Sequence, residues 1–510
     1  MKLSSHPDSF KTDRGGCQMK CIQNCFSNQQ KFLVPNLINN KLVPAFKEIF
    51  SSDGIKRNIS KYIGEYRKRI YDPTTTILSF LFQMLSADKS CSSAVARVNA
   101  DRIAQGLLPG SPDTGGYCKA REKLPEQLLQ EIYTETAYDI SNAAKAIATW
   151  KGRDVKVADG TTLTLADTEE NRFEYGIGPN QQEGIGFPIT RLVTIFSLFS
   201  GCSLAFSNDA YRGKGTGEHA LLRNILGSLI SGDIFLGDAY FASYFLIAQL
   251  KMLGIDAVFH SDGRRNIDFR TGERLGKGDH IVVYYRPIKP DWMTDEMYKS
   301  MPDSIEIREL KITIERPGFK ARSITIISTL LEEKKYAKDE LGELYRLRWM
   351  AELYFSSIKV SLKMDHIRSK TPEMVRKEIT ATLLAYNLIR KLILESAVKH
   401  NILPFYLSFK GTVQTLNEYK HLISNPAIDW GEAYSAMLDA IAKIQVGKRP
   451  NRMEPRAIKK RPKPFPRLKE IRSEAKKKLY GRRNGAKIEN RKNNEKIIQL
   501  KIFSNSCAFA

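Results

Sequence analysis

The sequence predicts an α/β protein whose sheet follows an all-α region and is interrupted by a mostly β insertion. Apolar residues with helical spacing fill residues 73–151, a β pattern begins near Asp154, and residues 262–332 again have an almost pure β pattern. The chain of 510 residues is too long for one ordinary core. We therefore expect several domains.

The N-terminal third of the chain is predicted to be helical. Residues 1–72 form a polar, basic leader whose pattern indicates no more than some helix. In residues 73–151, segments such as TTTILSFLFQMLS and SCSSAVARVNADRIAQGLL predict three or four helices, enough for a small all-α domain. A basic domain of this kind can bind DNA by placing a helix in the major groove. We expect a DNA-binding domain here, although no helix-turn-helix signature identifies the recognition helix.

Residues 152–261 predict the first part of an α/β core. DVKVADG, TLTLAD and ITRLVTIFSLFSG each indicate a strand, and a helix, the strand DIFLGDAYF, a second helix and the strand IDAVFHS follow. This order is typical of an RNase H-like core. The Gly-rich segment GKGTGEH lacks the ending of a P-loop, so we interpret it as a helix entry rather than a nucleotide site.

The core is predicted to resume after the β insertion of residues 262–332. Residues 333–400 indicate the second part of the RNase H-like core, residues 401–446 a helical C-terminal region, and residues 447–510 a basic tail. Between positions 448 and 496 the tail holds 20 Lys or Arg against 5 Asp or Glu. Its many prolines and charges cannot build a core, so we expect it to be disordered until it meets a partner.

The composition favours a nucleic-acid partner inside the cell. The net charge of +24 indicates a polyanion, nucleic acid before a membrane. Seven cysteines in so long a chain are no disulfide framework and suggest a reducing compartment. Cys17, Cys21 and Cys25 could share a helix face, but without a fourth ligand a zinc site is disfavoured. The start lacks the apolar region of a signal peptide, so we expect a cytoplasmic protein.

Residues 345–359, YRLRWMAELYFSSIK, form a helical pattern with four polar side chains in one row. Tyr345, Arg348, Glu352 and Lys359 lie at offsets of three, seven and fourteen, so on an α-helix they fall within roughly 60° of one another. Large apolar residues flank the row and cover the back of the helix, which predicts burial. The alternative, a solvated charged face, fits these flanks less well, and a buried glutamate between cations needs a reason.

Two aspartates lie at predicted strand ends, the positions where α/β sheets often carry functional residues. Asp159 ends the predicted strand in VKVADG, and Asp238 ends the predicted strand in IFLGD. Strand ends in open α/β sheets point into the ligand crevice, and these two strands should be neighbours. Glu352 could pack across the sheet and complete a trio. Each aspartate alone is more simply a turn residue, so the hypothesis depends on the combination with the row.

Three converging carboxylates would repel one another unless a divalent cation neutralised them. Hard oxygen ligands suit Mg²⁺ or Mn²⁺ rather than zinc. Two such ions can activate a water or a 3′-hydroxyl and stabilise the leaving oxygen at a phosphodiester. We therefore predict phosphoryl transfer on nucleic acid, with the trio as metal ligands and Tyr345, Arg348 and Lys359 in contact with the DNA backbone.

The spacing Y-x2-R-x3-E-x6-K resembles the YREK signature of the IS4-type insertion-sequence transposases. Other segments resemble the same family: DGTTLTLADTEEN, EGIGFPITRLV, GKGTGEHALLR, LGDAYFASYFLIAQL and, in the tail, EPRAIKKRPKPFPRL. The resemblance covers roughly residues 74–470 in order. It departs at Ala239 and Tyr240, where some members carry Arg-Gly after the second aspartate.

The resemblance implies a DDE transposase with an RNase H-like catalytic core. Asp159, Asp238 and Glu352 would hold Mg²⁺, for which Mn²⁺ can substitute, and the helical N-terminal domain would bind the terminal inverted repeats. A synaptic dimer would cut the element's ends and join the 3′-hydroxyls to target DNA, in the bacterial cytoplasm at the nucleoid. In some members an insertion-domain aromatic holds a flipped base. Trp292 is the candidate here, against the alternative of a core or turn tryptophan.

Two other functions stay open at this point. One is a catalytically inactive, DNA-binding derivative of a transposase, against which the intact trio of acids argues. The other is a stand-alone RNase H-like nuclease. Terminal inverted repeats beside the gene would distinguish a transposase from both.

Overall fold

The computed structural model describes most of the chain between residues 52 and 446. The described residues are 52–178, 185–263, 265–314, 322–423, 428–446, 470–471 and 473–478. The cysteine cluster at positions 17–25, most of the predicted leader and nearly all of the predicted basic tail lie outside them.

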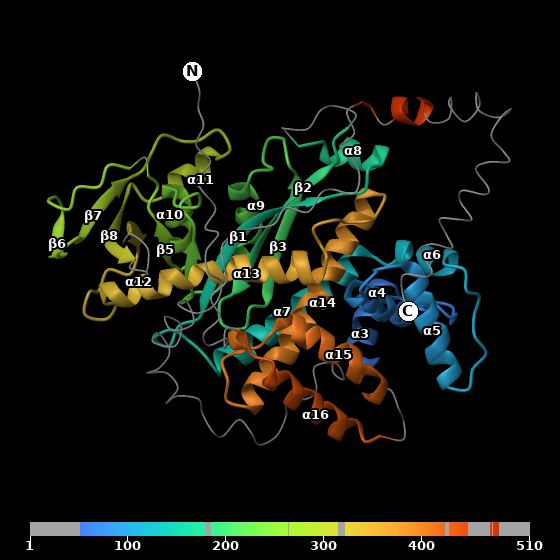
Figure 1. Cartoon of the computed structure of the whole chain (residues 1–510). Coiled ribbons are helices and arrows are strands. Elements are labelled where there is room, and N and C mark those ends of the chain that lie inside the picture. Colours follow the sequence, from blue (N-terminus) through green and yellow to red (C-terminus); the bar gives the residue numbers. More distant parts are fainter. Residues whose placement is uncertain are drawn as a thin grey trace.

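Nine strands of the described residues form one sheet in the order β3-β2-β1-β4-β5-β9-β8-β7-β6 (Figure 1). β1 is antiparallel to β2 and parallel to β4, β2 is antiparallel to β3, and β4 is parallel to β5. This is the RNase H-like arrangement that the order of elements predicted, so the predicted fold class is confirmed. The five strands of this core are β1 (Val155–Thr164), β2 (Ile189–Ser197), β3 (Ser203–Ala210), β4 (Ile234–Gly237) and β5 (Asp256–His260).

The strand boundaries differ from the prediction in two places. Most of DVKVADG and the first half of TLTLAD form the single strand β1, so the prediction that Asp159 ends a strand was wrong. The predicted strand ITRLVTIFSLFSG ends as β2 at Ser197, and its last four residues lie between β2 and β3. Gly201 lies in the turn between them at a φ of 69°, and a Cβ there would come within 2.7 Å of the Tyr354 ring. Both the backbone angle and the close approach therefore require glycine.

The insertion extends the core sheet instead of forming a sheet of its own. β9 pairs antiparallel with β5, and β8, β7 and β6 follow outward as antiparallel neighbours. The prediction of an almost pure β segment was wrong in one detail, because α11 (Asp295–Ser300) lies between β7 and β8. The four strands are β6 (Glu273–Gly276), β7 (Asp279–Tyr285), β8 (Ser304–Ile314) and β9 (Arg322–Ser328).

Helices cover both faces of the core sheet. α9 (Glu218–Ile225) and α10 (Tyr244–Met252) pack on the face that includes Ala158, in one hydrophobic cluster. The opposite face includes Val157 and packs against α12 (Lys338–Arg346) and α13 (Met350–Ser356). Figure 1 shows the run of α12 and α13 crossing the sheet as one nearly straight rod. Residues that alternate along β1 therefore face different helices.

The N-terminal helices pack onto a long central helix, α14 (Pro372–Lys399), which is buried along almost its whole length. Phe80, Leu128 and Leu384 belong to the same hydrophobic cluster, so the N-terminal helices and α14 share one core. These helices are α3 (Ser52–Tyr62), α4 (Pro73–Leu85), α5 (Cys91–Ala104), α6 (Gly115–Lys123) and α7 (Glu126–Lys145). The remaining labelled α-helices are α8 (Glu169–Tyr175), α15 (Phe409–Ile423) and α16 (Trp430–Lys443), and residues 473–478 are also helical. None of the helices described here has the length and apolar character needed to cross a membrane.

Candidate active site

Asp159 lies in the middle of β1, opposite Thr194 of β2, and is half-buried. Because side chains alternate along a strand, Asp159 shares the face of Val157 and points toward α13. Its Oδ1 accepts a hydrogen bond of 2.9 Å from the N–H of Gly160. Burial raises the pKa of Asp159 to about 7, and the nearby carboxylates of Asp238 and Glu352 add to this. The charge of Arg348 lowers the pKa of Asp159, but the effect of burial is larger.

Asp238 directly follows β4, as the sequence predicted, and lies beside Asp159. In the parallel pair β1–β4 the last matched residues are Val157 and Leu236, and the two aspartates each lie two residues further along. Oδ1 of Asp238 accepts hydrogen bonds from the N–H groups of Tyr240 (2.9 Å) and Phe241 (3.2 Å), which fix the carboxylate at the end of the strand.

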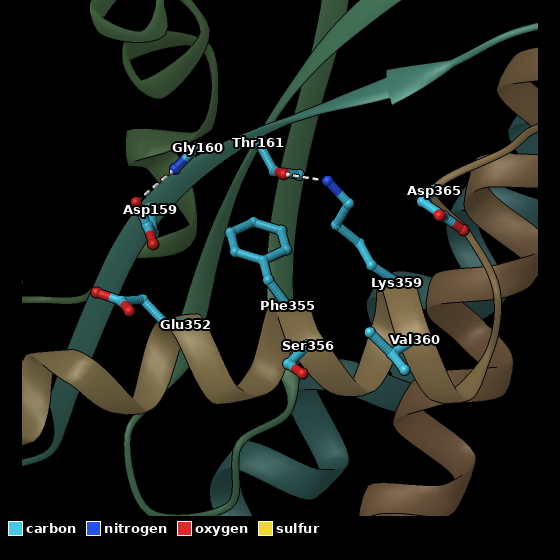
Figure 2. A pocket seen from close by; sticks show the side chains of 9 residues that line it. All are labelled: Asp159, Gly160, Thr161, Glu352, Phe355, Ser356, Lys359, Val360 and Asp365. Carbon is cyan, nitrogen blue, oxygen red and sulfur yellow. Dashed lines mark hydrogen bonds between the residues drawn. The ribbon is translucent and has the colours of Figure 1, made fainter. Parts of the chain in front are cut away.

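Glu352 reaches the same place from α13. Figure 2 shows its carboxylate and that of Asp159 turned toward each other across a cavity of about 370 Å³. The side chain of Glu352 is 41 % exposed, so it is open to a ligand in the cavity. Lys359 lines the other end of the cavity. The remaining lining residues are Gly160, Thr161, Phe355, Ser356, Val360 and Asp365.

The three carboxylates are the type of ligand that a hard divalent cation prefers, but their side chains do not surround a common point. Among the described residues, no group of three His, Cys, Asp or Glu side chains is close enough to hold a metal ion. The carboxylates nevertheless act on one another, since Asp238 and Glu352 both raise the pKa of Asp159. Carboxylate oxygens that leave one side open suit Mg²⁺ or Mn²⁺. The three carboxylates would have to come closer together for all of them to bind one ion.

Comparison with known proteins identifies the fold around this cavity. Residues 150–388 match the family model of the transposase DDE domain. Over 370 residues the chain is 24 % identical to the transposase InsG of insertion sequence element IS4 from Escherichia coli K12, which covers 71 % of this chain and 80 % of that protein. Residues 150–388 form a transposase DDE domain, and the chain is similar to the IS4-type transposases. The predicted family and enzyme class are confirmed.

More distant or shorter matches name proteins of the same kind. This transposase is 35 % identical over 80 residues to the transposase of insertion sequence element IS421 from Escherichia coli, a match that covers 16 % of this chain and 22 % of that one. A piggyBac transposase, solved as a synaptic complex with hairpin DNA, aligns with a TM-score of 0.42 at 11 % identity over 82 % of this chain and 88 % of that chain.

The helical row of the transposase is less regular than its spacing predicts. α12 leads through a 3₁₀ turn (Leu347–Trp349) into α13, and α13 ends in a π-helical turn (Ser357–Ser361) that carries Lys359. The Nζ of Lys359 donates hydrogen bonds of 3.1 Å to Oγ1 of Thr161 and to the carbonyl of Thr162. The row is therefore fastened to β1 at its C-terminal end.

Arg348 and Tyr345 of the transposase lie inside the site rather than on its rim. Arg348 is 17 % exposed, and its Nη2 lies 3.3 Å from Oε1 of Glu352. It also interacts electrostatically with both aspartates. Tyr345 is 8 % exposed, and burial raises the pKa of its phenol. The structure thus places a guanidinium among the three carboxylates.

Sequence reasoning missed Glu218, the first residue of α9. Its carboxylate lies against the backbone of Gly160, where a Cβ would come within 2.7 Å of its Cδ. Arg191 approaches it to 3.8 Å, and Asp238 together with burial raises the pKa of Glu218. Glu218 is therefore a fourth carboxylate beside the two aspartates, on the opposite face of β1 from Glu352. The segment GKGTGEH was interpreted only as a helix entry, and no local signal marked its glutamate.

Trp292 is not among the residues that line the cavity. It follows β7 in the insertion and is 43 % exposed. Its ring packs edge-on against Phe245 of α10 at 6.2 Å, and the guanidinium of Arg223 of α9 lies 3.7 Å from the ring centroid. Trp292 therefore presents a partly open aromatic face beside a cation on the α9 and α10 side of the sheet.

Asp159→Asn is expected to stabilise the transposase at pH 8 and to have little effect at pH 4. The folded pKa of about 7 lies above the ordinary value of 3.8, so the folded state holds a proton that the unfolded chain releases between these values. Stability from this group is therefore lost as the pH rises from about 4 to 7. Asparagine has no such loss, so the thermal unfolding midpoint of the variant should exceed that of the wild type above pH 7. Equal midpoints for the variant and the wild type at pH 8 would contradict the raised pKa of Asp159.

Proposed function

We propose that this transposase performs cut-and-paste transposition with Asp159, Asp238 and Glu352 as its catalytic carboxylates. The trio would hold Mg²⁺, or Mn²⁺ in its place, and the bound cation would activate the attacking hydroxyl and stabilise the leaving oxygen of a DNA phosphodiester. The observation that carries the proposal is that β1 and α13 meet at one open cavity with Asp159 and Glu352 facing each other, while Asp238 follows the neighbouring strand β4.

The surrounding residues would orient the carboxylates and the DNA. The backbone N–H groups at Gly160, Tyr240 and Phe241 fix one oxygen of each aspartate. Arg348 donates toward Glu352 and so limits repulsion within the trio. Tyr345 packs behind Arg348 and would support it, a role that differs from direct contact with DNA. This arrangement leaves the open side of the cavity for the scissile phosphate.

The partner would be double-stranded DNA at the element's terminal inverted repeats, followed by target DNA. Joining two ends requires two active sites held together, so we propose a dimer in the synaptic complex. The helices of residues 73–151 would bind the repeats. Trp292 would stack on an extruded base near the cleaved end, since its partly exposed ring lies beside Arg223, and base stacking on an aromatic ring offsets part of the cost of extrusion.

The proposal is tested by incubating the purified protein and Mg²⁺ with a linear DNA that carries the two ends of its own element. We expect cuts at the element's ends and joining of the released 3′-hydroxyl ends to a target plasmid. Binding to the ends without cleavage would instead indicate an inactive derivative. Cleavage that ignores the end sequences and yields no joined product would indicate a nuclease.

Lys359→Ala is expected to weaken binding to DNA ends without changing which sequence is preferred. Lys359 is the cation at the far end of the cavity from the carboxylates, where it can pair with one backbone phosphate. Losing one phosphate contact should reduce the slope of log affinity against log salt concentration by about one. Fluorescence anisotropy over a salt series measures this slope. Lys359→Arg should have the same slope as the wild type. An unchanged slope in Lys359→Ala would show that Lys359 does not contact a DNA phosphate.

A further inference from the structure

Two cysteines of the N-terminal helices lie in contact although they are distant in sequence. Cys91 is the first residue of α5, and Cys118 lies in α6. The Sγ–H of Cys118 points to Sγ of Cys91 at a distance of 3.7 Å. Both residues are partly exposed and neither is in a disulfide. A covalent bond between sulfur atoms is about 2.05 Å long, so a closure of roughly 1.6 Å would join them.

A cation and an amide donor lie against the sulfur atoms of the pair. The Nη2 of Arg121 lies 3.5 Å from Sγ of Cys91 and 4.0 Å from Sγ of Cys118. Nε2 of Gln83 donates to Sγ of Cys91 at 3.6 Å. Burial raises the pKa of Cys91, and the charge of Arg121 opposes this. A cation and an amide donor both stabilise a thiolate, which is the reactive form of cysteine.

Cys202, the third cysteine among the described residues, differs from Cys91 and Cys118 in its burial. Cys202 is fully buried at the start of the β3 hairpin strand, and burial raises its pKa to about 11. Its thiol contacts the carbonyl of Ala137 at 3.9 Å and the side chain of Ser200. No described cysteine lies beside it, and it has no route to solvent. Cys202 is therefore a core residue and serves as an internal control for reactivity.

We propose that Cys91 and Cys118 are an oxidation site that reacts with hydroperoxides and closes into a disulfide. One thiolate attacks an oxygen of the hydroperoxide, the O–O bond breaks, and the thiolate becomes a sulfenic acid. The other oxygen leaves with a proton, as water from hydrogen peroxide or as an alcohol from an organic hydroperoxide. The second thiolate then attacks the sulfenic sulfur, the S–S bond forms, and the hydroxyl group leaves as water. Both thiols are oxidised by two electrons in total, and one hydroperoxide is reduced. A disulfide-reducing thiol reverses the reaction.

The disulfide would join α5 to α6 and close a loop of the chain that runs from Cys91 to Cys118. Closing this loop restricts the unfolded chain, so oxidation should raise the thermal unfolding midpoint of the N-terminal helices by several degrees. Arg121 would keep its place over Tyr117, with its guanidinium 5.0 Å from the ring centroid. The reaction needs no catalytic carboxylate, so it is independent of the proposed transposition chemistry.

Peptide mapping of the full-length protein tests the site directly. After treatment with hydrogen peroxide, blocking of free thiols and digestion with trypsin, the peptides 90–97 and 103–119 should be found joined by a disulfide. Reduction with dithiothreitol should separate them, and Cys202 should stay unmodified. Asp238→Asn should give the same linkage, which separates this result from any failure of transposition. Recovery of the two peptides unlinked, while Cys202 or other cysteines react, would overturn the proposal.

Two single variants test the roles of the second thiol and of the cation separately. In Cys118→Ser the sulfenic acid on Cys91 has no resolving thiol, so dimedone should trap it, whereas in the wild type the disulfide forms first. Arg121→Gln removes the cation beside both sulfurs and should slow disulfide formation several-fold, with the same linkage at the end point. Trapping of Cys91 to the same extent in the wild type and in Cys118→Ser would show that the two cysteines do not resolve one another.

Discussion

Asp238→Asn is expected to lower the rate of cleavage at the element's ends by at least about 1,000-fold while leaving end binding within a few-fold of wild type. An amide has almost the same shape as the carboxylate and can keep the hydrogen bonds from the Tyr240 and Phe241 N–H groups through its oxygen. It lacks the negative charge that holds a divalent cation. A gel assay with labelled end DNA measures cleavage, and a mobility shift in Ca²⁺ measures binding.

Asp365 provides the matched control for this prediction. It lines the same cavity as Asp159 and Glu352 but belongs to the loop after the π-helical turn and has no place in the proposed trio. Asp365→Asn should therefore retain cleavage within a few-fold of wild type. Equal loss in Asp365→Asn and Asp238→Asn would mean that the overall charge of the cavity, and not the trio, sets the activity. Retained cleavage in Asp238→Asn would refute its assignment.

Arg308→Ala is expected to destabilise the protein by about 3–5 kcal/mol. Arg308 of β8 is fully buried, and its guanidinium donates two hydrogen bonds, of 2.9 and 2.7 Å, to the buried carboxylate of Asp279 on β7. It also donates to the carbonyl of Tyr336 at 2.7 Å, just before α12 begins. Alanine would leave an unpaired buried charge and release the start of α12, which leads into α13 and Glu352. Urea unfolding measures the loss.

The double variant Arg308→Met with Asp279→Leu shows whether the loss of stability comes from the unpaired charge or from the lost packing. Replacing both partners by apolar residues removes the unpaired charge, so most of the lost stability should return. The link to Tyr336 would still be missing, so cleavage should recover less completely than stability. A double variant as unstable as Arg308→Ala would show that packing rather than the buried pair controls this part of the sheet.

Most helices and the order of the core elements could be predicted from local patterns, because apolar periodicity reports which face of a segment is buried. Asp238 was placed correctly because β4 is a short apolar strand with a carboxylate at once after it. Asp159 was placed at a strand end because Gly160 suggested a turn. In the structure Gly160 lies inside β1 with the carboxylate of Glu218 against it, and this long-range contact leaves no trace in the local sequence.

In the site, too, local spacing predicted some residue positions, whereas others depend on contacts between segments that are distant in sequence. The spacing of Glu352 and Lys359 correctly indicated that both reach one cavity, since a helical period is a local property. The inward position of Arg348 could not be read from spacing, because it depends on carboxylates supplied by β1 and β4. The contact of Cys91 with Cys118 is likewise set by how α5 and α6 pack.

Anomalous scattering from Mn²⁺ in crystals of the full-length protein with end DNA tests the central claim most directly. We expect a peak in the cavity of Figure 2, bonded at about 2.1 Å by carboxylate oxygens of Asp159 and of at least one of Asp238 and Glu352. The peak should be absent from crystals of Asp159→Asn. Manganese bound only away from the cavity, with the three carboxylates still apart, would contradict the account.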